Sequence, residues 1–180
     1  MRIIGGSFRG RRLPKANKME LRPTTDFARE GLFNLLHHRM DLEDISFCDL
    51  FSGTGSISLE LKSRGAGDGM AVDISKNSAR YRDRLKTEWG IKKWRNLTAD
   101  VFQFLERGHG PFDLVIADPP YDHERLKELP ELVMESGILA EGGIFILEHP
   151  ESYSFERIPY FVEARNYGRV HFSFFEPQLQ

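Results

Sequence analysis

The sequence predicts an α/β fold: a mostly parallel sheet of seven strands with helices on both faces, a C-terminal antiparallel hairpin and a small basic N-terminal arm. Three observations predict it. Strand-like apolar runs alternate with helix-like segments from residue 45 to residue 149, which is typical of parallel strands joined by helices. The last apolar runs flank Asn166, Tyr167 and Gly168, a turn sequence that suits a hairpin. A length of 180 residues suits one domain with one core.

The expected elements follow in chain order. Residues 1–14 hold short apolar pieces around two glycines, which is typical of a small hairpin or an extended arm. A helix is expected from residue 26 to about residue 40, with Thr24 or Thr25 as its cap and Asp26 at its positive end. The apolar residues of that helix approximate one face: Phe27, Leu32, Phe33, Leu35 and Leu36.

The alternating part of the chain begins after this helix. Strands are expected over residues 45–51, 69–74, 94–99, 112–118 and 142–149. Helices are expected over residues 56–64, 75–89, 101–107 and 123–136, the last of them interrupted by Pro130. The closing hairpin is expected over residues 161–175. Ligands of such sheets bind beyond the carboxyl ends of the strands, where the strand order reverses.

The composition excludes several classes of protein. Hydrophobic content of 40% and charged content of 29% are ordinary for a soluble globular chain. No apolar stretch approaches the ~18 residues needed to cross a bilayer, and the start, MRIIGGSFRGRR, lacks the apolar core of a signal peptide. Cys48, the single cysteine, is expected to be a reduced packing residue, which suits the cytosol. No Cys/His cluster has metal-ligand spacing, so no metal is expected.

The charge is distributed unevenly along the chain. Residues 1–22 carry a net charge of +6, which leaves −8 for the remainder of a chain whose total is −2. A basic end on an acidic body predicts a segment that meets phosphates. From charge alone, a solvated terminus is an equal alternative.

A glycine turn follows the first strand of the alternating part, in CDLFSGTGS. Gly53 and Gly55 allow a tight turn and a close approach of a ligand to the backbone. A dinucleotide fingerprint would need a glycine at position 58, where the chain has Ser58. Asp49 would repel a pyrophosphate but would accept hydrogen bonds from a cationic, amine-bearing ligand.

Two further acids follow the next two strands. Asp73 lies twenty residues beyond Gly53, where a carboxylate can accept both hydroxyls of a ribose. At Asp100-Val101 a side chain and a backbone N–H can read an adenine edge. Each acid alone could be a helix cap or a solvated loop residue. Three acids after three successive strands describe a pocket for an adenosine without phosphate, which fits S-adenosylmethionine and does not fit NAD or ATP.

The fourth strand ends in Asp118-Pro119-Pro120-Tyr121. Two prolines make this turn rigid before a substrate arrives, and their carbonyls are expected to be free to accept hydrogen bonds. A carboxylate and a carbonyl are the acceptors that an exocyclic amine on a nucleobase needs. Tyr121 offers a flat face on which a flipped-out base can stack. The alternative is an ordinary turn beside a core aromatic residue.

FSGTGS, Asp73, Asp100 and DPPY, in this order, resemble the Rossmann-like class I S-adenosylmethionine-dependent methyltransferases that methylate amino groups. RIIGGSFRGRRLP, LRPTTDFAREGLFNLL and DLFSGTGSISLELKSRGA further resemble the bacterial RsmD family, which methylates guanine N2 in 16S ribosomal RNA. The resemblance implies a modification of the kind found at guanine 966, S-adenosyl-L-methionine as cofactor with S-adenosyl-L-homocysteine as product, and no metal. It also implies a cytoplasmic monomer that acts on 16S rRNA, the small ribosomal subunit or an assembly intermediate.

The resemblance also assigns roles to residues of this chain, and it divides the chain into an RNA-binding arm (1–22) and a catalytic domain (23–180). The target amine would be held by Asp118 and the Pro119 carbonyl, in a site completed by Pro120 and Tyr121. The cofactor would be bound by Asp49, Phe51, Gly53, Gly55, Asp73, Ile74, Asp100 and Val101, with Arg22 and Thr24 folded over it. The RNA would be bound by Arg2, Arg9, Arg11, Arg12 and Lys15. A role for Glu148, in the sequence LEHP, is left open.

Three rival functions share features with this sequence. DPPY alone would also allow an adenine-N6 or other amino-group methylase of DNA or RNA, because the motif recognises an amine and not one base. A non-catalytic alternative is an RNA-binding ribosome-assembly protein that has kept the methyltransferase fold, although the acids and glycines of the pocket are all present. A nicotinamide oxidoreductase is disfavoured by Ser58 and by DPPY.

Overall fold

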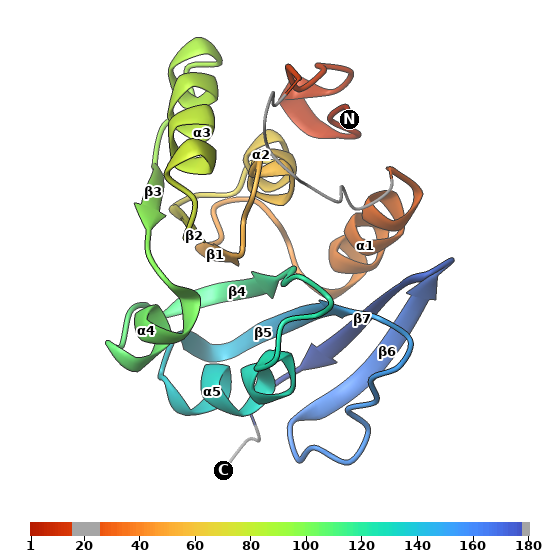
Figure 1. Cartoon of the computed structure of the whole chain (residues 1–180). Coiled ribbons are helices and arrows are strands. Elements are labelled where there is room, and N and C mark those ends of the chain that lie inside the picture. The colour runs from red at the N-terminus through yellow and green to blue at the C-terminus, as the bar shows by residue number, and fades with distance from the viewer. Residues whose placement is uncertain (16–25, 178–180) are drawn as a thin grey trace.

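The computed structural model describes residues 1–15 and 26–177, and it contains one seven-stranded sheet (Figure 1). The strands are β1 (Phe47–Leu50), β2 (Gly69–Asp73), β3 (Trp94–Thr98), β4 (Phe112–Ala117), β5 (Leu139–His149), β6 (Phe161–Tyr167) and β7 (Val170–Phe175). The helices are α1 (Asp26–Arg39), α2 (Ser56–Ser63), α3 (Lys76–Glu88), α4 (Val101–Glu106) and α5 (Leu129–Glu135). Short 3₁₀ helices cover Gly6–Phe8 (η1) and Leu126–Glu128 (η2).

The strand order is β3-β2-β1-β4-β5-β7-β6, which confirms the predicted fold class. The first five strands pair in parallel, β7 runs antiparallel to β5, and β6 runs antiparallel to β7. From β1 the chain first builds outward to β2 and β3, and it then returns to add β4 on the other side of β1. The order therefore reverses between β1 and β4, where doubly wound sheets bind their ligands.

Alternating side chains of the central strands supply two cores, one on each face of the sheet. Phe47 and Leu114 face the first core, which α1, α2 and α3 cover, whereas Cys48 and Val115 face the second, which α4 and α5 cover. Figure 1 shows these two helical layers above and below the sheet. Cys48 is fully buried, and burial raises the pKa of its thiol, as expected of a packing residue.

Two predictions about the helices need correction. Pro130 does not interrupt a helix: it lies in the first turn of α5, where its missing N–H costs nothing, and η2 precedes it. In α1, Leu32, Phe33 and Leu36 are buried as predicted, but Phe27 is 67% exposed. Phe27 is off the buried stripe because five residues, the separation from Leu32, correspond to well over one helical turn. The predicted caps Thr24 and Thr25 lie outside the described residues.

The described part of the arm is a compact turn. An isolated antiparallel bridge joins Arg2 to Arg12, with η1 between them, so the predicted hairpin is present in minimal form. Ile3 is buried against the first core and connects the arm to the body of the protein. Within the described ranges no helix is long and apolar enough to cross a membrane.

Candidate active site

The glycine turn after β1 is strained and closely packed. Phe51, Gly53 and Gly55 have φ angles of 57°, 48° and 74°, all in the left-handed region. A Cβ on Gly55 would lie 2.8 Å from Cδ of Arg82, so a side chain is excluded there by conformation and by space. A phenylalanine held at positive φ costs on the order of 1 kcal/mol or more. Such strain is concentrated at functional sites, and here it lies where the strand order reverses.

Asp49 lies beneath this turn and is 2% exposed. Its Oδ2 accepts the Ser58 hydroxyl at 2.5 Å and the Ser58 backbone N–H at 3.2 Å. Burial raises the pKa of Asp49 to about 6, although the Ser58 hydrogen bonds and the charge of Arg82 oppose this shift. Ser58, which replaces the last glycine of a dinucleotide fingerprint, is therefore the hydrogen-bond partner of Asp49, the acid that disfavours a pyrophosphate.

Asp73 connects the end of β2 to the same turn. Its Oδ2 accepts the N–H of Gly53 at 2.8 Å, and its Oδ1 accepts the N–H of Ser75 at 2.7 Å. Each carboxylate oxygen has a second lone pair, so the group keeps capacity for ribose hydroxyls. Ile74 is 72% exposed beside it, a position suited to cover an adenine ring.

Arg82 of α3 fixes the other side of Gly53, a role that the sequence did not indicate. Its Nη1 donates to the Gly53 carbonyl at 2.6 Å and its Nε to Oδ1 of Asn96 at 2.9 Å. The side chain is fully buried, and desolvation lowers its pKa while the charges of Asp49 and Asp73 raise it. Gly53 is thus held by a carboxylate at its N–H and by a guanidinium at its carbonyl.

Asp100 caps α4, with Oδ1 accepting the Gln103 N–H at 3.0 Å. Val101, the first residue of α4, is buried. The predicted contact of this pair with adenine remains a prediction, for which the Asp100 carboxylate keeps acceptor capacity beyond the cap hydrogen bond.

The DPPY corner follows β4 and is open to the surface. The Asp118 N–H donates to the Leu50 carbonyl at 3.3 Å, which places the corner against the end of β1. Asp118 and Tyr121 are half-buried, Pro119 is buried and Pro120 is exposed. The Pro120 carbonyl accepts the His123 N–H at 2.9 Å, so the expectation that both proline carbonyls are free is wrong for Pro120, because the turn closes on it.

Glu148 joins the site from the neighbouring strand. Ala117 of β4 pairs with Leu147 of β5, so Asp118 and Glu148 come next in register. The Tyr121 hydroxyl donates to Oε1 of Glu148 at 2.9 Å, and Glu148 is 4% exposed. The structure therefore gives Glu148 a defined place: it anchors the tyrosine of the corner.

An aromatic wall lies beside the glycine turn on the side of α4. The rings of Phe102 and His123 stack at 5.0 Å, and both contact Phe51 edge-on. The Arg125 guanidinium lies 4.1 Å from the centre of the Phe102 ring. Neither Phe102 nor His123 was predicted from the sequence. Among the described residues no group of His, Cys, Asp and Glu is arranged to hold a metal.

Comparison with known proteins identifies the family. The family model described as "Conserved hypothetical protein 95" matches residues 1–176. The chain belongs to this family. It is 30% identical over 159 residues to ribosomal RNA small subunit methyltransferase D of Escherichia coli K12, covering 88% of this chain and 79% of that protein. It is 33% identical to the putative rRNA methyltransferase YlbH of Bacillus subtilis, covering 83% and 82%. The predicted resemblance to the RsmD family is confirmed.

Solved structures place the family among the class I methyltransferases. The putative methyltransferase yhhF from Escherichia coli superposes with a TM-score of 0.86 at 28% identity, covering 100% of this chain and 99% of that one. TrmN from Thermus thermophilus shares the fold, with a TM-score of 0.67 over 84% of this chain and 48% of that one. The match to the family model includes the residues of the arm.

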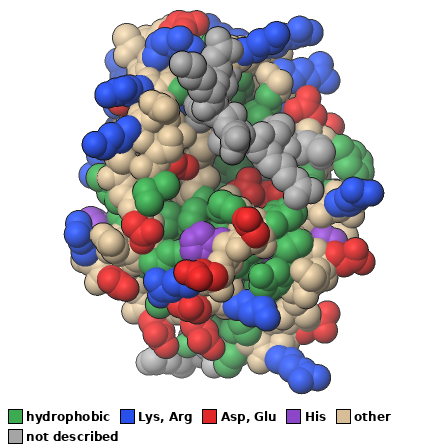
Figure 2. Space-filling view, in the orientation of Figure 1, with side chains coloured by type: hydrophobic (Ala, Val, Ile, Leu, Met, Phe, Trp, Pro, Cys, Tyr) green, Lys and Arg blue, Asp and Glu red, His purple; other side chains and the backbone are tan. Residues whose placement is uncertain are grey.

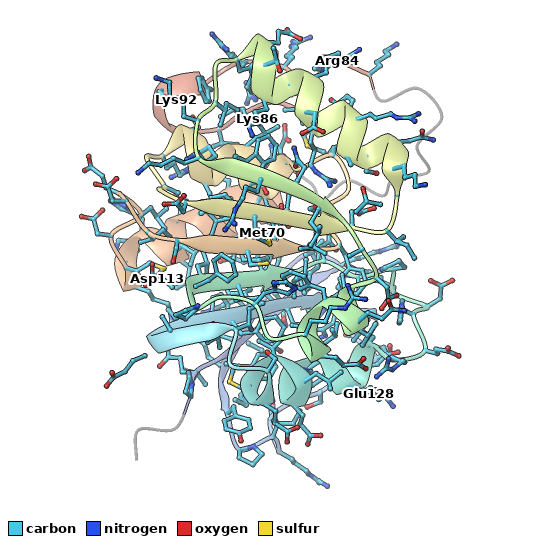
Figure 3. All side chains as sticks on the ribbon, turned by 90° about the vertical axis from the view of Figure 1, so that its left-hand side faces the viewer. Met70, Arg84, Lys86, Lys92, Asp113 and Glu128 are labelled. Carbon is cyan, nitrogen blue, oxygen red and sulfur yellow. The ribbon has the colours of Figure 1, made fainter. Side chains whose placement is uncertain are left out.

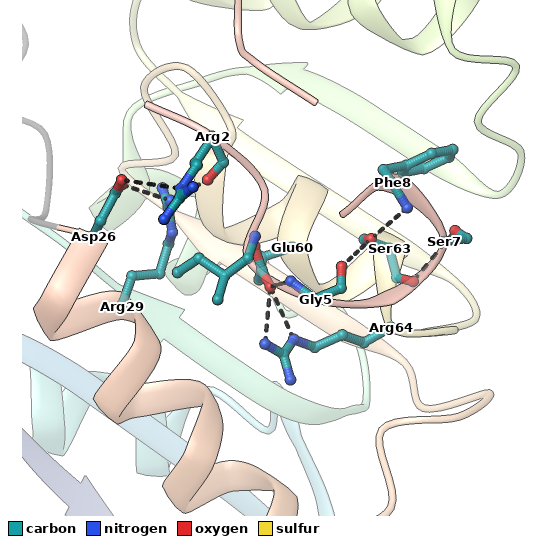
Figure 4. A network of polar contacts seen from close by, with 10 residues as sticks. Arg2, Gly5, Ser7, Phe8, Asp26, Arg29, Glu60, Ser63 and Arg64 are labelled. Carbon is teal, nitrogen blue, oxygen red and sulfur yellow. Dashed lines mark hydrogen bonds and ion pairs between the residues drawn. The ribbon is translucent and has the colours of Figure 1, made fainter. Parts of the chain in front are cut away.

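The arm is anchored on α2 by one buried carboxylate (Figure 4). Glu60 has no exposed surface; its Oε2 accepts the Ile4 N–H and its Oε1 the Gly5 N–H, each at 2.8 Å, and Arg64 pairs with it at 2.9 Å. A Cβ on Gly6, at φ 73°, would lie 1.8 Å from the Ser63 carbonyl oxygen. The paired glycines of the arm thus allow it to lie directly on the helix.

The cations predicted to bind RNA lie at the surface of this anchored arm, and Arg2 also lies 4.0 Å from the Asp26 carboxylate. Arg2, Arg9, Arg11, Arg12 and Lys15 are all exposed. The Arg11 guanidinium lies 5.0 Å from the Phe8 ring and 5.2 Å from the Trp89 ring, which connects the arm to the end of α3. The predicted cofactor residues Arg22 and Thr24 lie outside the described residues.

Proposed function

We propose that this protein is an S-adenosylmethionine-dependent methyltransferase that methylates the exocyclic N2 amine of a guanine in 16S ribosomal RNA. The family relationship supports an rRNA methyltransferase, since its relatives carry that description. The observation that supports methylation of an amino group is the DPPY corner: a rigid, surface-open turn hydrogen-bonded to the end of β1, next to the glycine turn. The choice of guanine N2 follows from the relationship to the RsmD family.

The residues around the glycine turn fit the proposed cofactor. Asp73 has acceptor capacity for ribose hydroxyls, and the exposed Ile74 supplies an apolar surface for adenine. The buried acid Asp49 disfavours a phosphate-bearing nucleotide at the turn. When bound, S-adenosylmethionine supplies a methyl group on a positively charged sulfur.

The corner acts on the acceptor nitrogen. The lone pair of a guanine amine is delocalised into the ring, so the nitrogen is a poor nucleophile. Asp118 and the Pro119 carbonyl are proposed to accept hydrogen bonds from its two N–H groups. These hydrogen bonds favour a pyramidal nitrogen and stabilise the positive charge that develops on attack. The methylated nitrogen would carry a surplus proton, and Asp118 would accept that proton along the same hydrogen bond.

Tyr121 is proposed to stack on the target base once that base has left its helix. Stacking of this kind contributes about 1–3 kcal/mol per base. The hydrogen bond from the Tyr121 hydroxyl to Glu148 restricts rotation of the ring before the base arrives. The fold therefore fixes the ring orientation before binding, which lowers the entropic cost of stacking on the base.

The remaining assignments belong to the same proposal. The arm (1–22) binds RNA through its exposed cations, and residues 23–180 form the catalytic unit, with Arg22 and Thr24 over the cofactor. The enzyme acts as a monomer in the cytoplasm, where small ribosomal subunits are assembled. The corner recognises an amine, so the choice of guanine over adenine depends on contacts outside it.

Nucleoside analysis tests the proposal. Small ribosomal subunits from a strain that lacks the gene are incubated with the protein and methyl-labelled S-adenosylmethionine, and the digested RNA is analysed by mass spectrometry. N2-methylguanosine at a single position is the expected product. Label in N6-methyladenosine would favour the alternative in which the enzyme methylates the amino group of adenine. RNA binding without label would favour the non-catalytic assembly protein.

A further inference from the structure

A second basic segment follows the glycine turn in the sequence. Residues 76–95 contain eight lysines and arginines and only two acids, Asp83 and Glu88, a net charge of +6. This equals the charge of residues 1–22 and leaves −14 for the rest of the chain. Figure 2 shows lysine and arginine side chains over the arm and α3 in the upper part of the molecule, and most acids in the lower part.

Three of these cations lie on one face of α3. Lys76, Arg80 and Arg84 are spaced four residues apart and are all exposed, and Figure 3 shows Arg84 on the outer side of the helix. We call them the basic face of α3. Like charges at this spacing destabilise a helix by about 0.2–0.5 kcal/mol per pair, and a lysine in the first turn opposes the helix dipole. The Arg84 guanidinium lies 5.6 Å from the centre of the Tyr81 ring, but the spacing of the three charges does not itself stabilise the helix.

The basic face has no ionic partner within residues 1–15 and 26–177, since none of its members forms an ion pair there. Arginines elsewhere differ: Arg39 pairs with Glu163 and Glu176, and Arg64 pairs with Glu60. The basic face is therefore a set of uncompensated positive charges, which is the arrangement that an external polyanion neutralises.

The basic face adjoins both the arm and the candidate active site. The Tyr81 hydroxyl donates to the Pro14 carbonyl at 2.8 Å, and the Phe8 and Trp89 rings lie 5.5 Å apart, so α3 contacts the arm from its middle to its C-terminal end. At its other end α3 begins directly after Ile74 and Ser75, which follow Asp73 at the carboxyl end of β2. A strand that runs along α3 therefore links the site to the arm.

We propose that Lys76, Arg80 and Arg84 bind the phosphate backbone of the RNA substrate and extend the surface of the arm toward the active site. The inference rests on the proposed function, because it takes RNA as the substrate. The three positions span about 12 Å along the helix axis.

The test replaces the basic face by the triple substitution Lys76→Gln, Arg80→Gln and Arg84→Gln. Glutamine is a good helix former and removes the like-charge repulsion, so the melting temperature is expected to stay the same or rise. The affinity for small ribosomal subunits from the deletion strain is expected to fall by about tenfold. The slope of log K against log salt concentration is expected to decrease in magnitude by about two to three, because three phosphate contacts contribute about 0.7–0.9 each. Affinity for S-adenosylmethionine stays unchanged.

The matched control removes three positive charges from exposed residues outside both basic segments (1–22 and 76–95): Arg107→Gln, Lys127→Gln and Arg157→Gln. This variant is expected to keep the wild-type salt slope. The inference is overturned if the basic-face variant keeps the wild-type salt slope, or if the control variant loses as much RNA affinity as the basic-face variant. In either case, methyl transfer by the wild-type protein would leave the proposed function standing. Wild-type protein that neither binds nor methylates the subunits overturns both.

Discussion

Replacing Glu60 by glutamine should release the arm from the body of the protein. The two carboxylate oxygens of Glu60 accept backbone N–H groups from Ile4 and Gly5, both at 2.8 Å, and the group is fully buried. In glutamine one oxygen becomes an amide NH₂, so one of the two backbone donors then faces another donor. A buried hydrogen bond to a charged acceptor contributes about 1.5–3 kcal/mol. At 1.4 kcal/mol per tenfold, this loss lowers the docked-to-undocked ratio by about 10–150-fold.

Limited trypsin digestion measures this release, because Arg9, Arg11 and Arg12 are exposed cleavage sites on the arm. Cleavage there should accelerate in the Glu60→Gln variant, and amide exchange of Ile4 and Gly5 should accelerate with it. RNA affinity should fall while S-adenosylmethionine affinity stays, since the glycine turn is not altered. Glu30→Gln removes an exposed acid from α1 and serves as the control. Wild-type digestion and exchange rates in the Glu60 variant would refute the anchoring role.

Three further predictions follow from the site. Tyr121→Phe keeps the ring but loses the hydrogen bond to Glu148, so kcat should fall about tenfold with KM for S-adenosylmethionine unchanged; an unaltered kcat would contradict the positioning role. Burial raises the pKa of Asp49 to about 6, above the ~3.9 of an unfolded aspartate. The folded state then holds the proton more tightly, so the free energy of unfolding should decrease by about 2 kcal/mol as the pH rises from about 4 to 6. Denaturant titrations should show this loss in the wild type and not in Asp49→Asn, and an equal loss in both would argue against it. Charge reversal at Arg9, Arg11 and Arg12 of the arm should weaken RNA binding and flatten its salt dependence. An unchanged salt slope would show that the arm does not contact phosphate.

The fold was predictable because its information is local. Alternating strand and helix patterns, with DPPY and the glycine turn at strand ends, fix a parallel sheet and place its functional edge. Asp49 shows where this reasoning stops. Its position after a strand was predictable, but its burial and its hydrogen bonds to Ser58 depend on how α2 packs beneath the turn.

The parts that the sequence did not reveal depend on contacts between distant segments. Glu148 is 27 residues from Tyr121, and only the pairing of β4 with β5 brings them together. Glu60 reads as one more charged residue of an amphipathic helix, yet it lies inward because the arm covers it. Arg82 stands in a run of charged residues, and no local signal separates it from its exposed neighbours.

The most direct measurement compares single-turnover methyl transfer by the wild-type protein and Asp118→Ala, alongside calorimetric titration with S-adenosylmethionine. The account predicts that both proteins bind the cofactor with a Kd of about 10⁻⁶ M. It also predicts that transfer to the guanine amine falls on the order of 10²–10³-fold in the variant, as when one preorganised charge-stabilising group is removed. Undiminished transfer by Asp118→Ala, or no cofactor binding by the wild type, would contradict the account.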